Sequence, residues 1–533
     1  MKQALLLGGI LVLTTSFVCA GGAAETGSRQ LNDFVIGTGA EPQSLDPHQV
    51  STIPEQRVLT GLFEGLVTSD PETARAVPAI AETWEIGEDR VTYTFTLREE
   101  VRWSDGSAIT AEQIVESWLR ILAPQTASPT AWFPAMFIAG GAEFNAGEIG
   151  AAEVAVRAID ERTFQFETVE PVPFMIEALT HHAFVVVPVH AIDRHGDKWT
   201  QPEHFVGNGP FLRADSPQEN VVLEPNPAYW NAGTVELDRV TFVPGGDDTE
   251  RLDMYEDGEI DWVPAVPADQ HAELAPREDY HVSPALGTYY YVLNTDRAPL
   301  DDPDVRRALT LALDRRALVD AAGAGGQIPT SSLVPDMQGY PGITGARYDV
   351  QAARELLSDA GYPGGQGFPR LTVLYNTDDG HRAIAESLQS QWLRNLGIDV
   401  NLQGQGWSTY LDRWRSADFD IIRAGWTGTY RDPTAFLNVF ATGDAMNGGR
   451  YRSDRYDHLL AEAARRDYGA DRFALLQEAE QLLVEDHAAV IPIYHYVHRN
   501  LIDREQWSGW YPNVMGRHPV GRIAPREGAE DQR

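Results

Sequence analysis

Few residues in this sequence have the types and spacing to bind a metal or to act on a substrate. The acidic segment 301–304 could supply carboxylate ligands, but Pro303 lies where a helix would begin, and acidic side chains are stabilised at helix N-termini by the helix dipole. We therefore predict a helix cap there. His181 and His182 have no second pair of ligands at metal spacing, which favours a structural role.

The usual catalytic motifs are missing from the sequence. It contains no G-x-S-x-G nucleophile elbow, no H-E-x-x-H, no G-x-x-x-x-G-K-[ST] phosphate loop and no EF-hand loop. The segments 37–39 and 404–406 lack the third glycine of a dinucleotide-binding fingerprint. Pairs of carboxylates do not point to a catalytic site in a chain with 78 acidic residues, because such pairs occur throughout it. We predict no catalytic residue, no metal site and no cofactor.

Three groups of aromatic residues remain, interleaved with arginine, glycine and polar residues. They are the three tyrosines Tyr289 to Tyr291, the pair Trp407 and Tyr410, and the segment from Arg423 to Tyr430. Residues of this kind form either a core or the wall of a ligand pocket, where apolar surfaces carry a few placed polar groups. Periodicity alone favours the core, and composition does not decide between the two.

The elements that must position these residues alternate between strand and helix. Residues 91–97 alternate strictly between apolar and polar, which predicts a half-buried strand. Thr110 and Gln113 form a capping box at the start of a helix. A second helix begins at Asp302 and keeps its apolar period to Val319. Further helices are predicted at 350–360, 384–395 and 473–485, with strands at 371–375 and 399–402. This alternation predicts an α/β fold.

Length and charge limit the class of protein further. A chain of 533 residues exceeds one hydrophobic core and is expected to form at least two lobes. No low-complexity linker follows Gln30, so the lobes should be interleaved in sequence. The formal charge of −36 disfavours nucleic acid and anionic lipid as partners. Lysine occurs only at Lys2 and Lys198, which fits either a biased genomic composition or a salt-rich habitat.

The N-terminus has the layout of an export signal. Lys2 precedes an apolar run from Ala4 to Val18 that is too short to span a bilayer comfortably. Cys19, the single cysteine, ends this run and suggests lipidation after cleavage, whereas ordinary cleavage after Ala20 is the alternative. We expect residues 1–19 to be a signal peptide of lipoprotein type, residues 20–30 a flexible tether, and the mature chain a soluble monomer.

A series of ordered motifs gives the chain a resemblance to a known family. Pro78 to Trp84, Tyr93 to Arg98 and Val101 to Gly106 resemble the signature of the extracellular solute-binding proteins of the dipeptide and oligopeptide class, family 5. Further matches follow in the expected order, at Ser44 to His48, Gly61 to Gly65, Asn208 to Phe211, Pro225 to Trp230, Gly258 to Asp261, Val305 to Leu309, Ala312 to Arg315, Leu374 to Thr377 and Arg423 to Trp426. The resemblance covers residues 35–520.

This resemblance implies a two-lobed periplasmic-binding-protein fold with an extra domain, and a ligand cleft between lobes joined by a hinge. We expect the lobe I core at 31–63, 189–285 and 497–525, the extra domain of lobe I at 64–188, and lobe II at 286–496. A peptide would lie extended in the cleft, its backbone paired like an added strand.

The resemblance also implies which residues bind the ligand. Arg423 and Trp426 fall where the family lines the cleft. His381 matches a residue near the C-terminal end of the ligand, where Arg423 could hold a carboxylate. The remaining expected ligand contacts are a pocket wall at Trp407, the aromatic strand at Tyr289 and Tyr291, and the positions Ser51, Ile53 and Thr429.

One departure from the family pattern concerns the end of the ligand that carries the ammonium group. The resemblance implies an aspartate at Thr429 and a glutamate at Ser51, and both acids are absent. Recognition of a free peptide N-terminus is therefore in doubt, and Asp432 could substitute only if its loop is rearranged.

We therefore expect an exported protein of the periplasm or cell envelope that captures short peptides and delivers them to the permease and ATPase of an ABC importer. It would touch the membrane only through a lipid anchor on Cys19. The alternatives are a ligand-sensing lipoprotein of the same fold, and a binder of a modified peptide, a murein peptide, a sugar or a metal chelate. No motif supports an enzyme.

Overall fold

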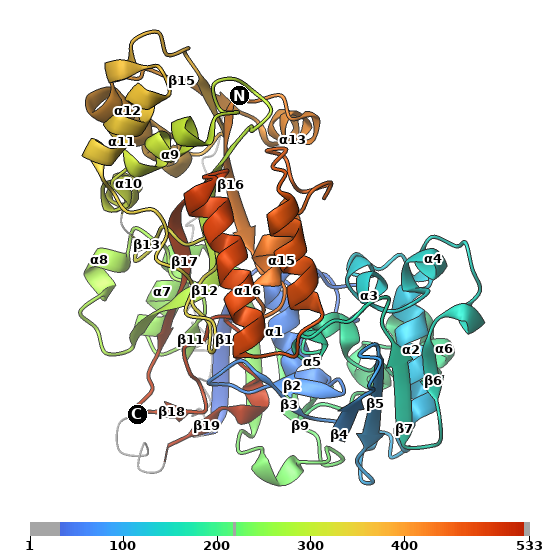
Figure 1. Cartoon of the computed structure of the whole chain (residues 1–533). Helices are drawn as coiled ribbons and strands as arrows, with labels where there is room; N and C mark the ends of the chain where they lie inside the picture. The colour runs from blue at the N-terminus through green and yellow to red at the C-terminus, as the bar shows by residue number, and fades with distance from the viewer. Residues whose placement is uncertain (1–31, 217–219, 324, 527–533) are drawn as a thin grey trace, which may run out of the picture.

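The computed structural model describes residues 32–216, 220–323 and 325–526. The predicted signal peptide, the tether and Cys19 lie outside the described residues. Within them, no helix combines the length and the apolar character needed to cross a membrane. Figure 1 shows the described chain as a long central sheet flanked by helices, with a separate module at one side.

An 11-stranded sheet runs through the molecule. Along its main path the strands are β15 (Asn401–Gln405), β14 (Thr372–Asn376), β16 (Ile421–Thr427), β12 (Tyr280–Leu293), β17 (Val490–Ile502), β11 (Trp262–Val263), β1 (Asp33–Gly39), β10 (Arg239–Pro244), β9 (Val221–Pro225) and β8 (Phe211–Ala214). The short β13 (Ile328–Pro329) also pairs with β17. The predicted lobe II supplies one end of this sheet and the predicted lobe I supplies the other.

Two long antiparallel strands, β12 and β17, connect these two ends. Pro284 pairs with Val497, but the next paired residue of β12, Thr288, lies opposite His495. The ladder is therefore interrupted by a bulge, where the bulged strand bends and its twist increases. The predicted boundaries between the lobes, at 285/286 and 496/497, fall at this interruption.

The side module contains most of the predicted extra domain (Figure 1). Its sheet has the order β4 (Ala81–Ile86), β5 (Thr92–Leu97), β7 (Thr163–Glu167) and β6 (Val156–Ala158). The associated helices are α2 (Ala111–Leu122), α3 (Trp132–Phe137) and α4 (Gly141–Asn145), and the hairpin β2 (Val67–Ser69) and β3 (Ala76–Pro78) joins it to the main body. Tyr93, Phe95 and Leu97 are buried as the strict alternation predicted. The capping box of Thr110 and Gln113 is also confirmed.

Helices cover both ends of the main sheet. The helices of the lobe I end and of the junction with the side module are α1 (Ile53–Leu62), α5 (Met175–Ala178), α6 (Val189–His195), α7 (Asp248–Glu256) and α8 (His271–Leu274). Those of the lobe II end are α9 (Pro303–Leu311), α10 (Arg315–Ala321), α11 (Val350–Asp359), α12 (Asp379–Leu396), α13 (Trp407–Ser416), α14 (Thr434–Leu437), α15 (Asp454–Ala464) and α16 (Ala470–Gln481). A two-stranded sheet of β18 (Trp507–Ser508) and β19 (Ala524–Pro525) closes the C-terminal segment.

The prediction of one continuous helix from Asp302 to Val319 was wrong. Asp302 does cap α9 through its side chain, as predicted for the acidic segment, but α9 ends at Leu311. Asp314 then accepts hydrogen bonds from the backbone N–H groups of Arg316 and Ala317 and starts α10. Aspartate is favoured at an N-cap because it satisfies these N–H groups, and an apolar period that continues through the break does not reveal it.

Burial divides the described residues into several cores. One core lies under the lobe I sheet around Phe34, Trp262 and Trp507, and a second lies on one face of the lobe II sheet around Tyr289, Tyr291 and Trp392. A third core joins the side module to the other face of the lobe II sheet. At this contact Tyr430 stacks on Phe174, with ring centroids 4.4 Å apart.

Candidate functional site

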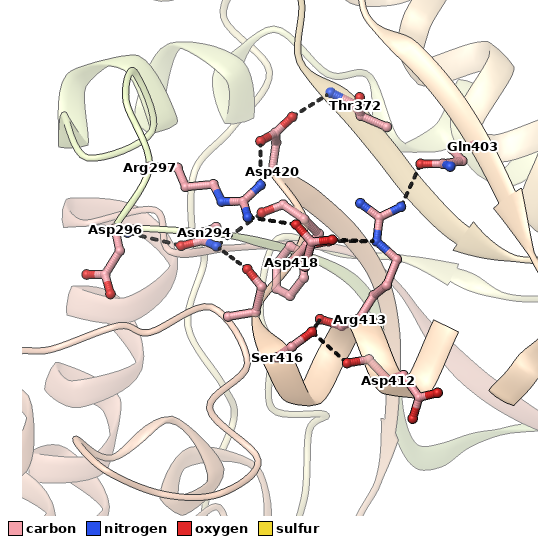
Figure 2. Close-up of polar contacts among 12 residues, drawn as sticks. Asn294, Asp296, Arg297, Thr372, Gln403, Asp412, Arg413, Ser416, Asp418 and Asp420 are labelled. Carbon is pink, nitrogen blue, oxygen red and sulfur yellow. Dashed lines mark hydrogen bonds and ion pairs between the residues drawn. The ribbon is translucent and has the colours of Figure 1, made fainter. Parts of the chain in front are cut away.

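Strand β16 carries Arg423 and Trp426, and a polar network fixes its start (Figure 2). Arg297 donates to Asp418 at 3.0 Å and to Asp420 at 3.2 Å, and Asp420 also accepts the backbone N–H of Thr372 in β14 at 3.0 Å. Arg413 of α13 joins the network through Asp418 and Gln403. These contacts tie β16 to β14 and α13, so the strand is held at the point where it enters the sheet.

Arg423 lies at the centre of a polar and aromatic cluster on one face of this strand. Its guanidinium carbon lies 4.5 Å from the centre of the Tyr289 ring. Nη1 donates to Oδ1 of Asn376 and Nη2 to the hydroxyl of Tyr496, each at 3.2 Å. Its Nε is buried without a hydrogen-bond partner among the described residues. None of the described carboxylates lies within 4.0 Å, so this cation has spare donors and no counter-charge at that distance in the described part of the chain.

His381 lies beside this cation and is uncharged at neutral pH. Its ring centroid is 5.5 Å from that of Tyr289. Burial and, next, the charge of Arg423 lower the pKa of His381 to about 4, although Asp378 opposes the shift. Asp378 caps α12 by accepting the backbone N–H of His381 at 3.0 Å, so the histidine begins the helix next to the cluster. Arg423 and His381 together therefore offer one positive charge and neutral donors, a suitable surface for a carboxylate.

The structure places the predicted tyrosines beneath this cluster. Tyr289 and Tyr291 are fully buried and belong to the lobe II core, and Tyr289 also stacks on Tyr494 with centroids 4.8 Å apart. They support Arg423 and His381 from below, while Tyr290 faces the opposite core. This split follows from the alternation of side chains along a strand.

Trp407 and Trp426 occupy different surroundings. Trp407 is 59% exposed, and its ring stacks on Tyr410, whose hydroxyl donates to the backbone oxygen of Arg423 at 2.6 Å. Trp426 lies on the other face of β16 from Arg423, partly buried against the core that joins the side module. Its indole N–H donates to the carbonyl of Ala435 at 2.6 Å.

The remaining predicted ligand residues lie at the start of α1 and just after β16. Ser51 and Ile53 are exposed at the start of α1, and Ile53 is 67% exposed. Thr429 follows β16 and is half-buried. Asp432 is fully buried, and its two oxygens accept from the Nη atoms of Arg472 at 2.6 and 2.8 Å. Asp432 is therefore occupied by a buried ion pair and is not available to bind an ammonium group.

Sequence reasoning missed two residues of the Arg423 cluster. Asn376 lies at the end of β14, inside the motif from Leu374 to Thr377, but nothing marked its side chain as a partner of Arg423. Tyr496 lies where the β12–β17 ladder is interrupted, and its hydroxyl reaches the site because Gly425 has no side chain. Only the pairing of distant strands brings these residues together.

The described residues contain no group of three or more His, Cys, Asp or Glu side chains arranged to hold a metal. His181 caps the short turn 182–184 by accepting the backbone N–H of Ala183 at 3.2 Å. Burial lowers the pKa of both His181 and His182.

A profile of the bacterial extracellular solute-binding proteins, family 5 Middle, matches residues 75–448. The chain belongs to this family. It is 36% identical to the periplasmic oligopeptide-binding protein OppA of Salmonella typhimurium, over 98% of this chain and 97% of that protein. The two-lobed α/β fold predicted from the sequence is thereby confirmed.

Two solved structures of relatives, one unliganded and one with a bound peptide, can be compared with this fold. The unliganded open form of the murein tripeptide binding protein MppA superposes with a TM-score of 0.84 at 32% identity, covering 93% of this chain and 97% of that chain. The Haemophilus influenzae OppA complex with the peptide RPPGFSPFR superposes with a TM-score of 0.66 at 31% identity, covering 93% and 99%. The two relatives have nearly equal identity and coverage, but the open form has the higher TM-score. This chain is therefore closer in shape to the open form than to the peptide complex.

Proposed function

We propose that this protein captures short peptides in a cleft between lobe I and lobe II and delivers them to the permease and ATPase of an ABC importer in the inner membrane. It binds its ligand without changing it. Residues 1–19 direct export to the periplasm or cell envelope. A lipid on Cys19 anchors the protein to a membrane there. The family and its relatives with bound peptide support the ligand class.

The observation that carries the proposal is the site around Arg423. An arginine that is partly buried, has no described carboxylate within 4.0 Å and lies beside a neutral histidine is costly unless a ligand supplies the counter-charge. The C-terminal carboxylate of a peptide is such a group. We assign ligand contact to Arg423 and His381, with Trp407, Trp426, Thr429, Ser51 and Ile53 as walls and Tyr289 and Tyr291 as the support below.

A hinge at the interruption of the β12–β17 ladder fits this function. The bend falls between Pro284 and Thr288 on one strand and at Tyr496 on the other. Because the hydroxyl of Tyr496 accepts a hydrogen bond from Nη2 of Arg423 at 3.2 Å, closure of the lobes and occupation of the site are coupled through one residue. The similarity to an unliganded open form supports an open resting state.

Mass spectrometry of the material that co-purifies with the protein tests the proposal. The protein is purified without denaturation, its ligand is released in acid, and the released molecules are sequenced by fragmentation. We expect a set of peptides of a few residues with varied sequences. A single non-peptide solute, or conversion of an added peptide into products, would overturn the proposal.

A further inference from the structure

Arg517 is a second cation at the junction of the three parts of the molecule. It lies in the C-terminal segment of lobe I. Its Nη1 donates to the hydroxyl of Thr180 at 3.2 Å and to the carbonyl of Thr180 at 3.4 Å, and its Nη2 donates to the carbonyl of Thr429 at 3.4 Å. One guanidinium thus contacts the extra domain and the loop that follows β16.

None of the carboxylates in the described ranges lies within 4.0 Å of Arg517. The acids closest to its contacts in sequence are occupied elsewhere. Glu177 pairs with Arg431 at 3.5 Å and with Arg75 at 3.8 Å, and Asp432 pairs with Arg472. Burial lowers the pKa of Arg517 to about 10, which still leaves it charged at neutral pH.

The neighbouring histidines add no charge of their own. Burial and, next, the charge of Arg517 lower the pKa of His182 to about 4. Burial, His182 and Arg517 likewise hold the pKa of His181 well below its ordinary value. Glu55 is the acid that acts on His182, and its carboxylate accepts the backbone N–H groups of Gln43, Ser51 and Thr52. Among the described residues, Arg517 is therefore a positive charge without a paired carboxylate, in a chain whose formal charge is −36.

We propose that Arg517 binds a carboxylate of the ligand at the wall formed with Thr180 and Thr429. The three oxygens that it contacts are neutral, and two of the distances are at the long end for a hydrogen bond, so the guanidinium retains the capacity for a bidentate carboxylate. An ammonium group at the same place would meet a like charge with no acid to offset it. The ligand class is thus a peptide whose amino end is acylated by a group that carries a carboxylate.

This inference rests on the proposed function, and one competition experiment separates the two. A randomised tripeptide pool is prepared in three forms, with a free amine, an N-acetyl cap or an N-succinyl cap, and all three keep the C-terminal carboxylate. The equimolar mixture is offered to the full-length protein, and the bound fraction is quantified by mass spectrometry. We expect the succinyl form to be enriched at least tenfold over the free amine and severalfold over the acetyl form.

The variant Arg517→Gln should abolish the advantage of the succinyl form over the acetyl form. The matched control Arg239→Gln removes an exposed lobe I arginine that pairs with Glu224 at 3.1 Å, and should keep the wild-type order. Preference for the free amine, or equal retention of the acetyl and succinyl forms by the wild type, would overturn the role of Arg517 and leave peptide binding intact. If the wild-type protein retained none of the three forms, the proposed function itself would be overturned. The wild-type order tests the inference even if the variant does not fold.

Discussion

Replacing Arg423 by glutamine should weaken binding of a peptide with a free C-terminal carboxylate and hardly affect the corresponding amide. Arg423 has a buried Nε without a partner among the described residues, and its two Nη contacts go to the neutral groups of Asn376 and Tyr496. His381 is neutral above its pKa of about 4, so the arginine supplies the positive charge of the cluster.

The size of the effect follows from the hydrogen bonds that are lost. A hydrogen bond to a charged group contributes about 1.5–3 kcal/mol. Such a loss raises the dissociation constant of the carboxylate form about 10- to 150-fold. The amide form carries no charge at this end and should change by less than about threefold. The difference between the two forms isolates the pairing of Arg423 with the carboxylate, as in a double-mutant cycle.

Isothermal titration calorimetry of both peptide forms with both proteins measures this difference. The free energy of unfolding is measured in parallel because Arg423 also lies over the Tyr289 ring, at 4.5 Å. Arg239→Gln is the matched control, since Arg239 is an exposed arginine of β10 that pairs with Glu224 at 3.1 Å, and the change should leave both affinities unchanged. Equal losses for the carboxylate and the amide would refute the reasoning.

Three further predictions concern other parts of the molecule. Trp426→Ala should weaken peptide binding by at least ~1 kcal/mol in calorimetry with little change of melting temperature; unfolding at unchanged affinity per folded molecule would favour a purely structural role. Burial lowers the pKa of His495 to about 4, so the unfolded state binds more protons between about pH 6.5 and 4 and the free energy of unfolding falls on acidification. In urea titrations, His495→Gln should reduce this fall between pH 7 and 5.5 by about 1 kcal/mol, and an unchanged fall would contradict this. Arg472→Met should lower the free energy of unfolding by about 3–5 kcal/mol in the same titrations, because it leaves Asp432 charged and buried; a loss below about 1 kcal/mol would contradict this.

The sequence predicted individual helices and strands well where the deciding side chains lie within the element or at its end. The strand at residues 91–97 and the caps at Thr110 and Asp302 each depend on residues a few positions apart, and the structure confirms them. The break before α10 was missed because the capping side chain of Asp314 lies within an uninterrupted apolar period. The fold class followed from the order of many motifs and not from any single one.

The candidate site was only partly predictable. Arg423 and His381 were expected from resemblance, but their support by Tyr289, Asn376 and Tyr496 depends on strands that are far apart in sequence. Arg517 carried no signal at all. Its proposed role rests on the absence of a carboxylate within 4.0 Å among the described residues, and only a folded structure can show that in so acidic a chain.

The most direct test of peptide capture between two lobes is small-angle X-ray scattering with and without peptide. The protein is stripped of co-purified ligand, and scattering is recorded alone and at saturation with the peptides identified by mass spectrometry. We predict a smaller radius of gyration at saturation, because the lobes close about the interruption between β12 and β17. An unchanged radius of gyration at proven saturation would contradict this account.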